Sequence, residues 1–233
     1  MKETFLILDT ETTIEGENMP NQSVFDIGWT ISDREGNILK TRSYIVKEFK
    51  YQALHRRKAF LVDSGAVSSQ VYFTKLLDNT IKVMEWQYIM GQLKRDCIKF
   101  NVEFIGAYNL GFDKRVIEKT SFFFSGKEFD FFDNYFLIDL YHVSAYTILN
   151  TEKYKKFAKE HGLYTEKGNI QTGAEPCFKY LTNNLNYIEE HTAFQDSYDE
   201  TIILHKLLNQ KEKIELHAFS INQQAWRIVN EKD

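Results

Sequence analysis

The first apolar run of the chain is short and ends at a carboxylate. Residues 5–8 read Phe-Leu-Ile-Leu, and Asp9 follows them directly. A continuous apolar run of this length fits a strand that is buried on both faces. Two further strand-like segments, 24–31 and 38–46, come next, joined by the turn-rich sequence 32–37. The pattern predicts an antiparallel meander at the start of the chain, with an acid where its first strand ends.

Later segments alternate between helical and strand-like patterns. The expected strands are 103–108 and 136–138, and the expected helices are 68–79, 84–101, 112–120, 140–150, 153–161, 177–182 and 192–209. Residues 47–66 fit neither pattern. Asp139 stands where an N-cap would start the helix over 140–150. Strands first, and then strands that alternate with helices, indicate an α/β fold with a mixed sheet flanked by helices.

The composition narrows the classes of protein to which the chain can belong. With 233 residues, 43% of them hydrophobic, it can bury a sizeable core, most economically in one domain. The two cysteines, Cys97 and Cys177, lie far apart and exclude both a cysteine zinc site and a disulfide framework. No apolar stretch approaches a membrane span, and the first apolar run is too short for a signal peptide. We therefore expect a cytoplasmic protein that does not enter a membrane.

Two acids stand two positions apart at the end of the first predicted strand. Side chains at i and i+2 of a strand point to the same side, so Asp9 and Glu11 would project together while Thr10 faces away. Adjacent carboxylates repel each other unless a cation lies between them. Mg²⁺ and Mn²⁺ prefer oxygen ligands and would neutralise such a pair. The same pair is also common in solvated loops, so it needs support from elsewhere in the chain.

Two further acids begin predicted helices. Asp113 follows the strand over 103–108, and Asp196 lies in the first turn of the helix over 192–209. At helical spacing Asp196 shares a stripe with four apolar residues, Ala193, Ile203, Leu204 and Leu207. A carboxylate that faces the protein body needs a cation or hydrogen-bond donors. The alternative is structural, because an acid in a first helical turn lies at the positive end of the helix dipole.

One histidine lies close to these acids in the sequence. His191 precedes Asp196 by five residues and stands ahead of the helix rather than in its apolar stripe. Imidazole titrates near neutral pH and can accept a proton from an attacking water. A surface histidine, or one that makes a hydrogen bond at a helix start, is the alternative interpretation.

Three short motifs, taken in order, resemble those of the DEDDh 3′→5′ exonuclease family. The motifs are Asp9-x-Glu11, the run from Tyr108 through Asn109-Leu110-Gly111-Phe112 to Asp113, and His191-x-Ala193-x-x-Asp196. The family includes the proofreading epsilon subunit of bacterial DNA polymerase III, ribonuclease T and oligoribonuclease. The resemblance covers most of residues 4–209 and implies a ribonuclease H-like fold. It divides the chain into an exonuclease domain, 1–210, and a C-terminal extension of unknown role, 211–233.

The resemblance also implies a reaction and a set of site residues. The chain would hydrolyse phosphodiester bonds at the 3′ end of single-stranded DNA and release nucleoside 5′-monophosphates. Asp9, Glu11, Asp113 and Asp196 would hold two divalent ions, Mg²⁺ or Mn²⁺, with Asp9 shared between them. His191 would take the proton from the attacking water. The ions would let a chain of net charge −4 bind a polyanion, and a polymerase or replication partner would fit the proofreading relatives.

Two positions depart from the family pattern. Ile14 stands where the family often has glycine, and Tyr108 stands where it often has histidine. Neither position supplies a required ligand, so the differences concern contacts to the terminal nucleotide. Thr12 is carried over as a nucleotide-contacting residue.

Three other functions compete with DNA exonuclease activity. The motifs do not distinguish deoxyribose from ribose, so an RNA exonuclease of the ribonuclease T or oligoribonuclease type is the nearest alternative. A catalytically silent nucleic-acid-binding or interaction module is another, although the intact five-residue set argues against it. An endonuclease of ribonuclease H type is disfavoured by the motif around His191, which by resemblance fits cleavage from an end.

Several remaining segments allow both an interaction role and a structural one. The aromatic segment 122–132 can stack bases, but core packing or a hydrophobic partner surface is the favoured interpretation. The basic segments 55–58 and 153–159 can contact phosphates, with solvated surface as the default. Asp199 and Glu200 are expected to support the site rather than to belong to it.

Overall fold

The computed structural model describes residues 3–13, 22–49, 69–210, 214–222 and 224–230. A six-stranded sheet of order β4-β3-β2-β1-β5-β6 forms its centre. The strands are β1 (Thr4–Thr12), β2 (Val24–Asp33), β3 (Ile38–Val46), β4 (Lys82–Met84), β5 (Phe104–Ala107) and β6 (Phe136–Asp139). The first three make the predicted antiparallel meander, and β5 and β6 run parallel to β1. The predicted mixed α/β sheet is confirmed.

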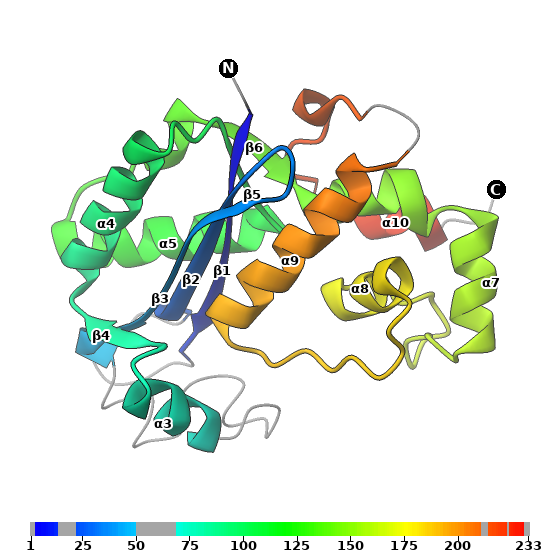
Figure 1. Ribbon diagram of the computed structural model, residues 1–233, viewed down its shortest axis with the longest axis horizontal. Coiled ribbons are helices and arrows are strands. Elements are labelled where there is room, and N and C mark those ends of the chain that lie inside the picture. The colour runs from blue at the N-terminus through cyan, green and yellow to red at the C-terminus, as the bar shows by residue number, and fades with distance from the viewer. Residues whose placement is uncertain (1–2, 14–21, 50–68, 211–213, 223, 231–233) are drawn as a thin grey trace.

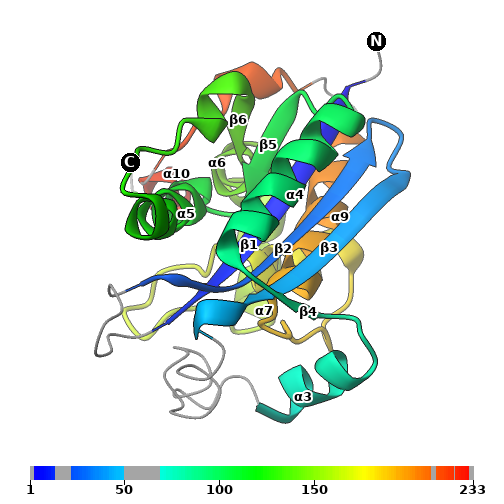
Figure 2. The same cartoon turned by 90° about the vertical axis from the view of Figure 1, so that its left-hand side faces the viewer.

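Helices cover both faces of the sheet. Their bounds are α3 Ser69–Leu77, α4 Trp86–Lys99, α5 Leu110–Ser125, α6 Leu140–Ser144, α7 Glu152–Glu160, α8 Ala174–Thr182, α9 Ala193–Leu208 and α10 Ala225–Asn230. Three short helices are η1 Phe131–Asn134, η2 Ala145–Leu149 and η3 Leu216–Ala218. Helix α9 crosses one face of β1 and β2 (Figure 1), whereas α4 lies over the opposite face (Figure 2). None of the described helices is long and apolar enough to span a membrane.

Three predicted boundaries were wrong, and each has a local cause. The helix expected over 84–101 begins at Trp86, because Met84 pairs with β3 in the short strand β4. Helix α5 runs past residue 120 to Ser125, where Gly126 at φ 66° ends it in the left-handed conformation. Helix α8 starts at Ala174 rather than 177, since a proline is tolerated in the first turn of a helix.

Successive side chains of β1 point alternately into two hydrophobic cores, one on each face of the sheet. Leu6 and Leu8 pack with residues of α4 and α5 in one core. Phe5 and Ile7 pack with residues of α9 in the other. Because alternation continues to the strand end, the side chains that follow Ile7 at every second position face α9. Those side chains are Asp9 and Glu11.

The β2 side chains that face α9 are small or polar. Gly28 touches the start of that helix so closely that an added Cβ would lie 2.4 Å from the backbone oxygen of Ala193. Farther along, the Thr30 and Ser197 hydroxyls lie 3.4 Å apart, and Ser32 Oγ lies 2.9 Å from His205 Nε2. The helix therefore approaches β2 through hydrogen bonds and a glycine rather than through bulky apolar groups.

The residues after α9 pack into the hydrophobic core to which α9 itself contributes. Five buried side chains of this segment belong to the core that also contains α9 residues: Ile214, Leu216, Phe219, Ala225 and Val229. The backbone N–H of Asp139 donates to the Phe219 carbonyl, which ties this segment to the end of β6. The division into residues 1–210 and 211–233 stays a prediction.

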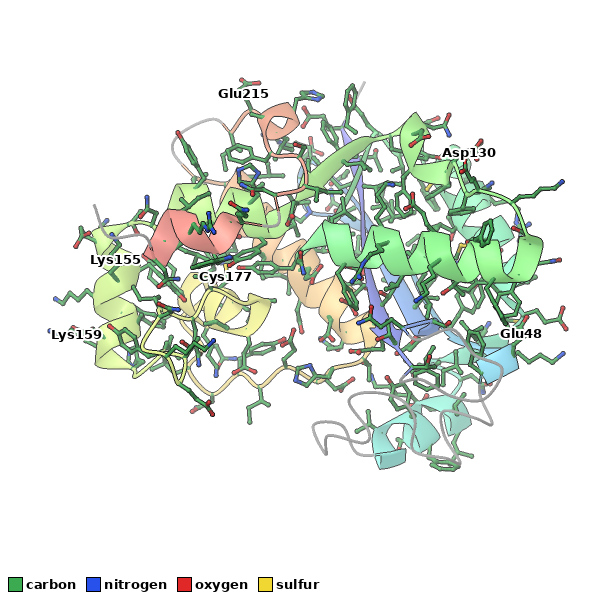
Figure 3. All side chains as sticks on the ribbon, turned by 180° about the vertical axis from the view of Figure 1, so that it is seen from behind. Glu48, Asp130, Lys155, Lys159, Cys177 and Glu215 are labelled. Carbon is green, nitrogen blue, oxygen red and sulfur yellow. The ribbon has the colours of Figure 1, made fainter. Side chains whose placement is uncertain are left out.

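The segments with two interpretations divide between core and surface. Phe131 and Phe132 are buried, whereas Phe122 and Phe123 are exposed on α5. The basic segment 55–58 lies outside the described residues. Lys155 and Lys159 project from α7 at the outer end of the molecule, away from the sheet (Figure 3). Lys155 pairs there with Glu152 at 3.2 Å, as expected of a solvated surface.

Candidate active site

The carboxyl end of β1 carries the first two acids of the site. Asp9 pairs in register with Gly28 of β2, and Glu11 pairs with Asp26. Both acids face α9, and Thr10 faces the other side of the sheet, as the alternation predicted. The contact at Gly28 therefore brings the start of α9 directly against the strand position beside Asp9.

Asp196 reaches the site from the first turn of α9. The start of that helix is anchored by Asp26, whose Oδ2 accepts a 3.1 Å hydrogen bond from the Ala193 N–H. Asp196 is 5% exposed, and its Oδ1 has no hydrogen-bond partner within the described part of the chain. The predicted stripe is confirmed, because the four apolar residues that share it are all buried: Ala193, Ile203, Leu204 and Leu207.

His191 lies just before α9, where the sequence placed it. Its backbone adopts the left-handed region at φ 56°, which turns the chain between the preceding segment and the N-cap Thr192. One ligand atom from each of Glu11, His191 and Asp196 lies within 4.8 Å of the others. His191 Nδ1 also lies 3.8 Å from a carboxylate oxygen of Glu189. The imidazole is partly exposed and stands beside two of the predicted ligands.

Asp113 approaches from the opposite face of the sheet. It lies in the first turn of α5, is 3% exposed, and accepts a 2.7 Å hydrogen bond from the Thr10 hydroxyl. Thr10 thus fixes an acid that belongs to another motif. Sequence reasoning missed this role because the bond crosses between β1 and α5, and no local pattern reports such a contact.

The acids influence one another strongly. Burial and the charges of Asp113 and Asp196 raise the pKa of Asp9 well above its usual value. Burial, followed by the charge of Asp196, likewise raises the pKa of Glu11. Burial raises the pKa of Asp113 to about 7 and, with the charge of Glu189 next, that of Asp196 to about 9. Without a cation, these carboxyls resist simultaneous ionisation.

Two more buried carboxylates hold the turn that leads to Asp113. The Tyr108 N–H donates to Glu200 Oε2 at 2.9 Å, and the Asn109 N–H donates to Asp139 Oδ1 at 3.1 Å. Asn109 adopts the left-handed conformation at φ 73°, so the turn needs such partners to keep its shape. Asp139 also caps α6 through the Tyr141 N–H at 3.0 Å, which confirms the predicted N-cap.

Glu200 connects this turn to α9. It lies one helical turn after Asp196, is 4% exposed, and its pKa is raised by burial and then by the charge of Asp113. Its spacing of four residues from Asp196 was the only sequence signal for a shared face. The helix that carries one acid of the site therefore also supports the turn that carries another.

The weaker sequence assignments lie at the edge of the site. Thr12 is the last residue of β1, is buried and pairs with Val24. Its contact with a nucleotide stays a prediction. Ile14 lies outside the described residues, and Tyr108 lines a pocket.

The chemistry of these side chains fits a divalent cation. Carboxylate oxygens and an imidazole converge at the carboxyl end of β1, and one buried oxygen of Asp196 has no partner in the described structure. Hard divalent ions take such oxygens as ligands, and a buried carboxylate without a donor is otherwise costly. A cation between the acids would also remove the mutual repulsion that raises their pKa values.

No family model and no curated protein matches the chain. Solved structures do match it. The crystal structure of cell-death related nuclease 4 has a TM-score of 0.55 at 17% identity, and the match covers 89% of this chain and 64% of that one. A full-length 3′-exonuclease has a TM-score of 0.56 at 14% identity, with coverage of 95% and 92%.

A third match is E. coli exonuclease I, in a zinc-bound complex with single-stranded DNA. Its TM-score is 0.51 at 12% identity, and the match covers 91% of this chain and 41% of the exonuclease. The chain thus spans less than two thirds of cell-death related nuclease 4 and less than half of exonuclease I. The sheet order, the flanking helices and these matches identify the fold of the chain as the ribonuclease H-like α/β fold of such nucleases.

Proposed function

We propose that the chain is a metal-dependent 3′→5′ exonuclease that hydrolyses single-stranded DNA and releases nucleoside 5′-monophosphates. The observation that carries the proposal is the convergence of Glu11, His191 and Asp196 within 4.8 Å, close to the partly buried Asp9 and the buried Asp113. Four acids and a histidine from three motifs, two of the acids buried and the other groups partly buried, would be costly to place together without cations.

Each residue has a role that follows from its position. Asp9, Glu11 and Asp196 would hold one divalent ion, and Asp9 and Asp113 would hold a second, either as Mg²⁺ or as Mn²⁺. The bound ions would polarise the scissile phosphate and stabilise the charge on the attacking and leaving oxygens. His191 would accept the proton of the attacking water at an imidazole nitrogen. Its partial exposure leaves room for that water.

Single-stranded DNA is favoured over RNA as the substrate. Exonuclease I, which shares the fold, was captured with single-stranded DNA. A polymerase or replication partner would fit a proofreading role and rests on the motif resemblance alone.

The test follows mononucleotide release from labelled single-stranded DNA, with an RNA of the same sequence in parallel. We expect release from the 3′ end with Mg²⁺ or Mn²⁺, none after chelation, and a loss of about 10³-fold in Asp9→Asn, since several kcal/mol of charge stabilisation disappear. The exposed Asp133→Asn is the matched control and should retain full activity. Undiminished activity in Asp9→Asn would refute the site, and faster release from the RNA would move the proposal to an RNA exonuclease.

A further inference from the structure

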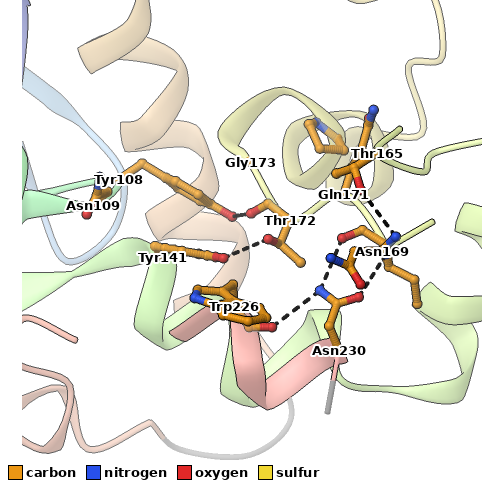
Figure 4. A pocket seen from close by; sticks show the side chains of 12 residues that line it. Tyr108, Asn109, Tyr141, Thr165, Asn169, Gln171, Thr172, Gly173, Trp226 and Asn230 are labelled. Atoms are coloured by element: carbon orange, nitrogen blue, oxygen red, sulfur yellow. Dashed lines mark hydrogen bonds between the residues drawn. The ribbon is translucent and has the colours of Figure 1, made fainter. Parts of the chain in front are cut away.

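A pocket of about 570 Å³, whose lining is drawn in Figure 4, reaches the turn at Tyr108 and Asn109 that leads to Asp113. Tyr108 and Asn109, at the turn after β5, form one wall, and Tyr141 of α6 lies next to them. Thr172, from the segment before α8, and Trp226, from α10, also line the pocket. The motifs assigned to the active site make no use of most of this pocket.

Hydrogen bonds and stacking hold the walls of the pocket. The Tyr108 and Tyr141 rings stack with centroids 5.4 Å apart and planes at 22°. Both hydroxyls reach Thr172: Tyr108 donates to its carbonyl at 2.7 Å, and Tyr141 lies 2.7 Å from its Oγ1. The Ile170 N–H donates to Asn230 Oδ1 at 2.8 Å, which joins α10 to the segment before α8. The pocket is therefore formed before any ligand binds.

The lining chemistry selects a class of ligand. Each of the twelve described lining residues is uncharged, so the pocket offers no counter-charge to a phosphate and no ligand set for a metal ion. It offers aromatic rings, including Trp226 at 42% exposure, together with side-chain amides such as Asn169 and Gln171. Aromatic faces stack on planar rings, and amides pair with the donors and acceptors at their edges. A nucleobase has both features.

The pocket shares a lining residue with a second hollow at the start of α5. Asn109 lines it and also lines a second hollow with Gly111, Phe112 and Arg115. Asp113 follows Asn109 by about one helical turn. Arg115 is exposed in this second hollow and can attract a phosphate of the strand backbone.

We propose that this pocket binds a nucleobase of the substrate strand, on the 5′ side of the bond that is cut. The inference rests on the proposed exonuclease function. When mononucleotides are released from the 3′ end, only one nucleotide lies 3′ of the bond that is cut, so every other base of the strand lies on its 5′ side. A strand long enough to reach the pocket would gain a stacking contact worth about 1–3 kcal/mol, or roughly 5- to 150-fold in affinity. A strand too short to reach it would not.

Trp226 makes the proposal measurable by fluorescence. Of the three tryptophans, Trp29 and Trp86 are buried, so exposed-tryptophan emission comes from Trp226. With the Asp9→Asn variant, which should not cut, we expect an oligothymidylate of about eight nucleotides to change this emission and a thymidine dinucleotide to leave it unchanged. The same titration on a protein that also carries Trp226→Phe should show no change.

Kinetics provide the second measurement. In Trp226→Ala we expect KM for the long oligothymidylate to rise about 10-fold, with kcat and dinucleotide cleavage unchanged, and Trp226→Phe should restore most of the loss. Asn169→Asp adds a negative charge at an exposed position and should act in the same direction even if Trp226→Ala fails to fold. Equal KM changes on long and short strands, or no emission change with the long strand, would overturn the pocket assignment. Absence of all cleavage, with the emission change intact, would instead refute the exonuclease and leave a nucleobase pocket.

Discussion

The two faces of β2 carry different kinds of side chain. On the side of α4 and α5, Ile27, Trp29 and Ile31 are fully buried in an apolar core. On the side of α9, the alternate positions are Asp26, Gly28, Thr30 and Ser32. The apolar face gains stability from area removed from water, which is insensitive to exact placement. The α9 face relies on hydrogen bonds and a backbone contact, which depend on position.

This difference separates stability from the geometry of the site. The start of α9 carries Asp196 and lies against Gly28, so its place is set by the polar face. A substitution that changes the side-chain volume on the apolar face should lower mainly the free energy of unfolding. Substitutions on the α9 face should therefore alter catalysis more than their size suggests, and substitutions on the other face should do the reverse.

The largest expected effect is that of Asp196→Asn. Loss of a proposed ligand should lower kcat by about 10³-fold, measured by mononucleotide release. The metal-free protein should gain thermal stability at the same time, because one buried, repelling carboxyl is removed. Added Mg²⁺ should raise the melting temperature of the parent protein and not that of the variant. A variant less stable than the parent without metal would show that Asp196 stabilises the fold.

The adjacent pair Gly28→Ala and Trp29→Ala compares the two faces directly. A methyl at residue 28 meets the Ala193 backbone and must displace the start of α9, and a shift of about 1 Å can cost roughly 10²-fold in kcat. Removal of the Trp29 ring should cost about 3–5 kcal/mol of unfolding free energy and leave kcat nearly unchanged. Denaturant unfolding and kcat, measured on both proteins, check the contrast. The reverse outcome would break it.

Glu200→Gln should have a smaller effect. The amide keeps the shape of the side chain and can still accept the Tyr108 N–H, but it removes a charge beside Asp113 and Asp196. Groups that support ligands typically change metal affinity or activity by about 10- to 100-fold. We expect the concentration of Mg²⁺ for half-maximal activity to rise toward the lower limit of that range. Glu128→Gln, at an exposed acid, is the control. A fall in kcat with an unchanged Mg²⁺ requirement would argue against a supporting role.

The last expected effect, which concerns the metal-free protein alone, is a pH dependence of its stability. Burial raises the pKa of Asp26 and Asp113 to about 7 and that of Asp196 to about 9, from 3.8. Between the unfolded and native values the folded state holds more protons, so the unfolding free energy falls as pH rises through this window. Each kcal/mol corresponds to about 2–4 °C in a domain of this size. With chelator, the melting temperature should therefore decrease from about pH 6 to about pH 9, and Mg²⁺ should flatten the decrease. An increase with pH would contradict the raised pKa values of these carboxyls.

Patterns with a fixed period were predictable from the sequence. The alternation that turns Asp9 and Glu11 to one side, and the helical stripe that contains Asp196, both follow from local geometry and are present in the structure. The fold class followed from the order of such segments. Contacts between elements distant in sequence carry no such period. Thr10 with Asp113, and Glu200 with the Tyr108 turn, therefore could not be foreseen.

The short elements were missed for a related reason. The three residues of β4 and the segment around η3 and α10 have weak patterns of their own, and they form because a neighbouring strand or core is already present. The catalytic and metal-binding roles of the five motif residues remain proposals. They rest on where these side chains meet and on the chemistry that their charges require.

The turn at Tyr108 takes part in both the pocket and the candidate active site. Its ring forms a wall of the pocket, and its amide is held by the helix that bears Asp196. A base that settles against the ring would therefore stiffen the same backbone on which the acids depend, so strand occupancy and ion affinity would strengthen each other reciprocally. As digestion shortens the strand below the reach of the pocket, both would weaken together. The proposed exonuclease would then release a short remnant of nearly uniform length instead of degrading every molecule to completion.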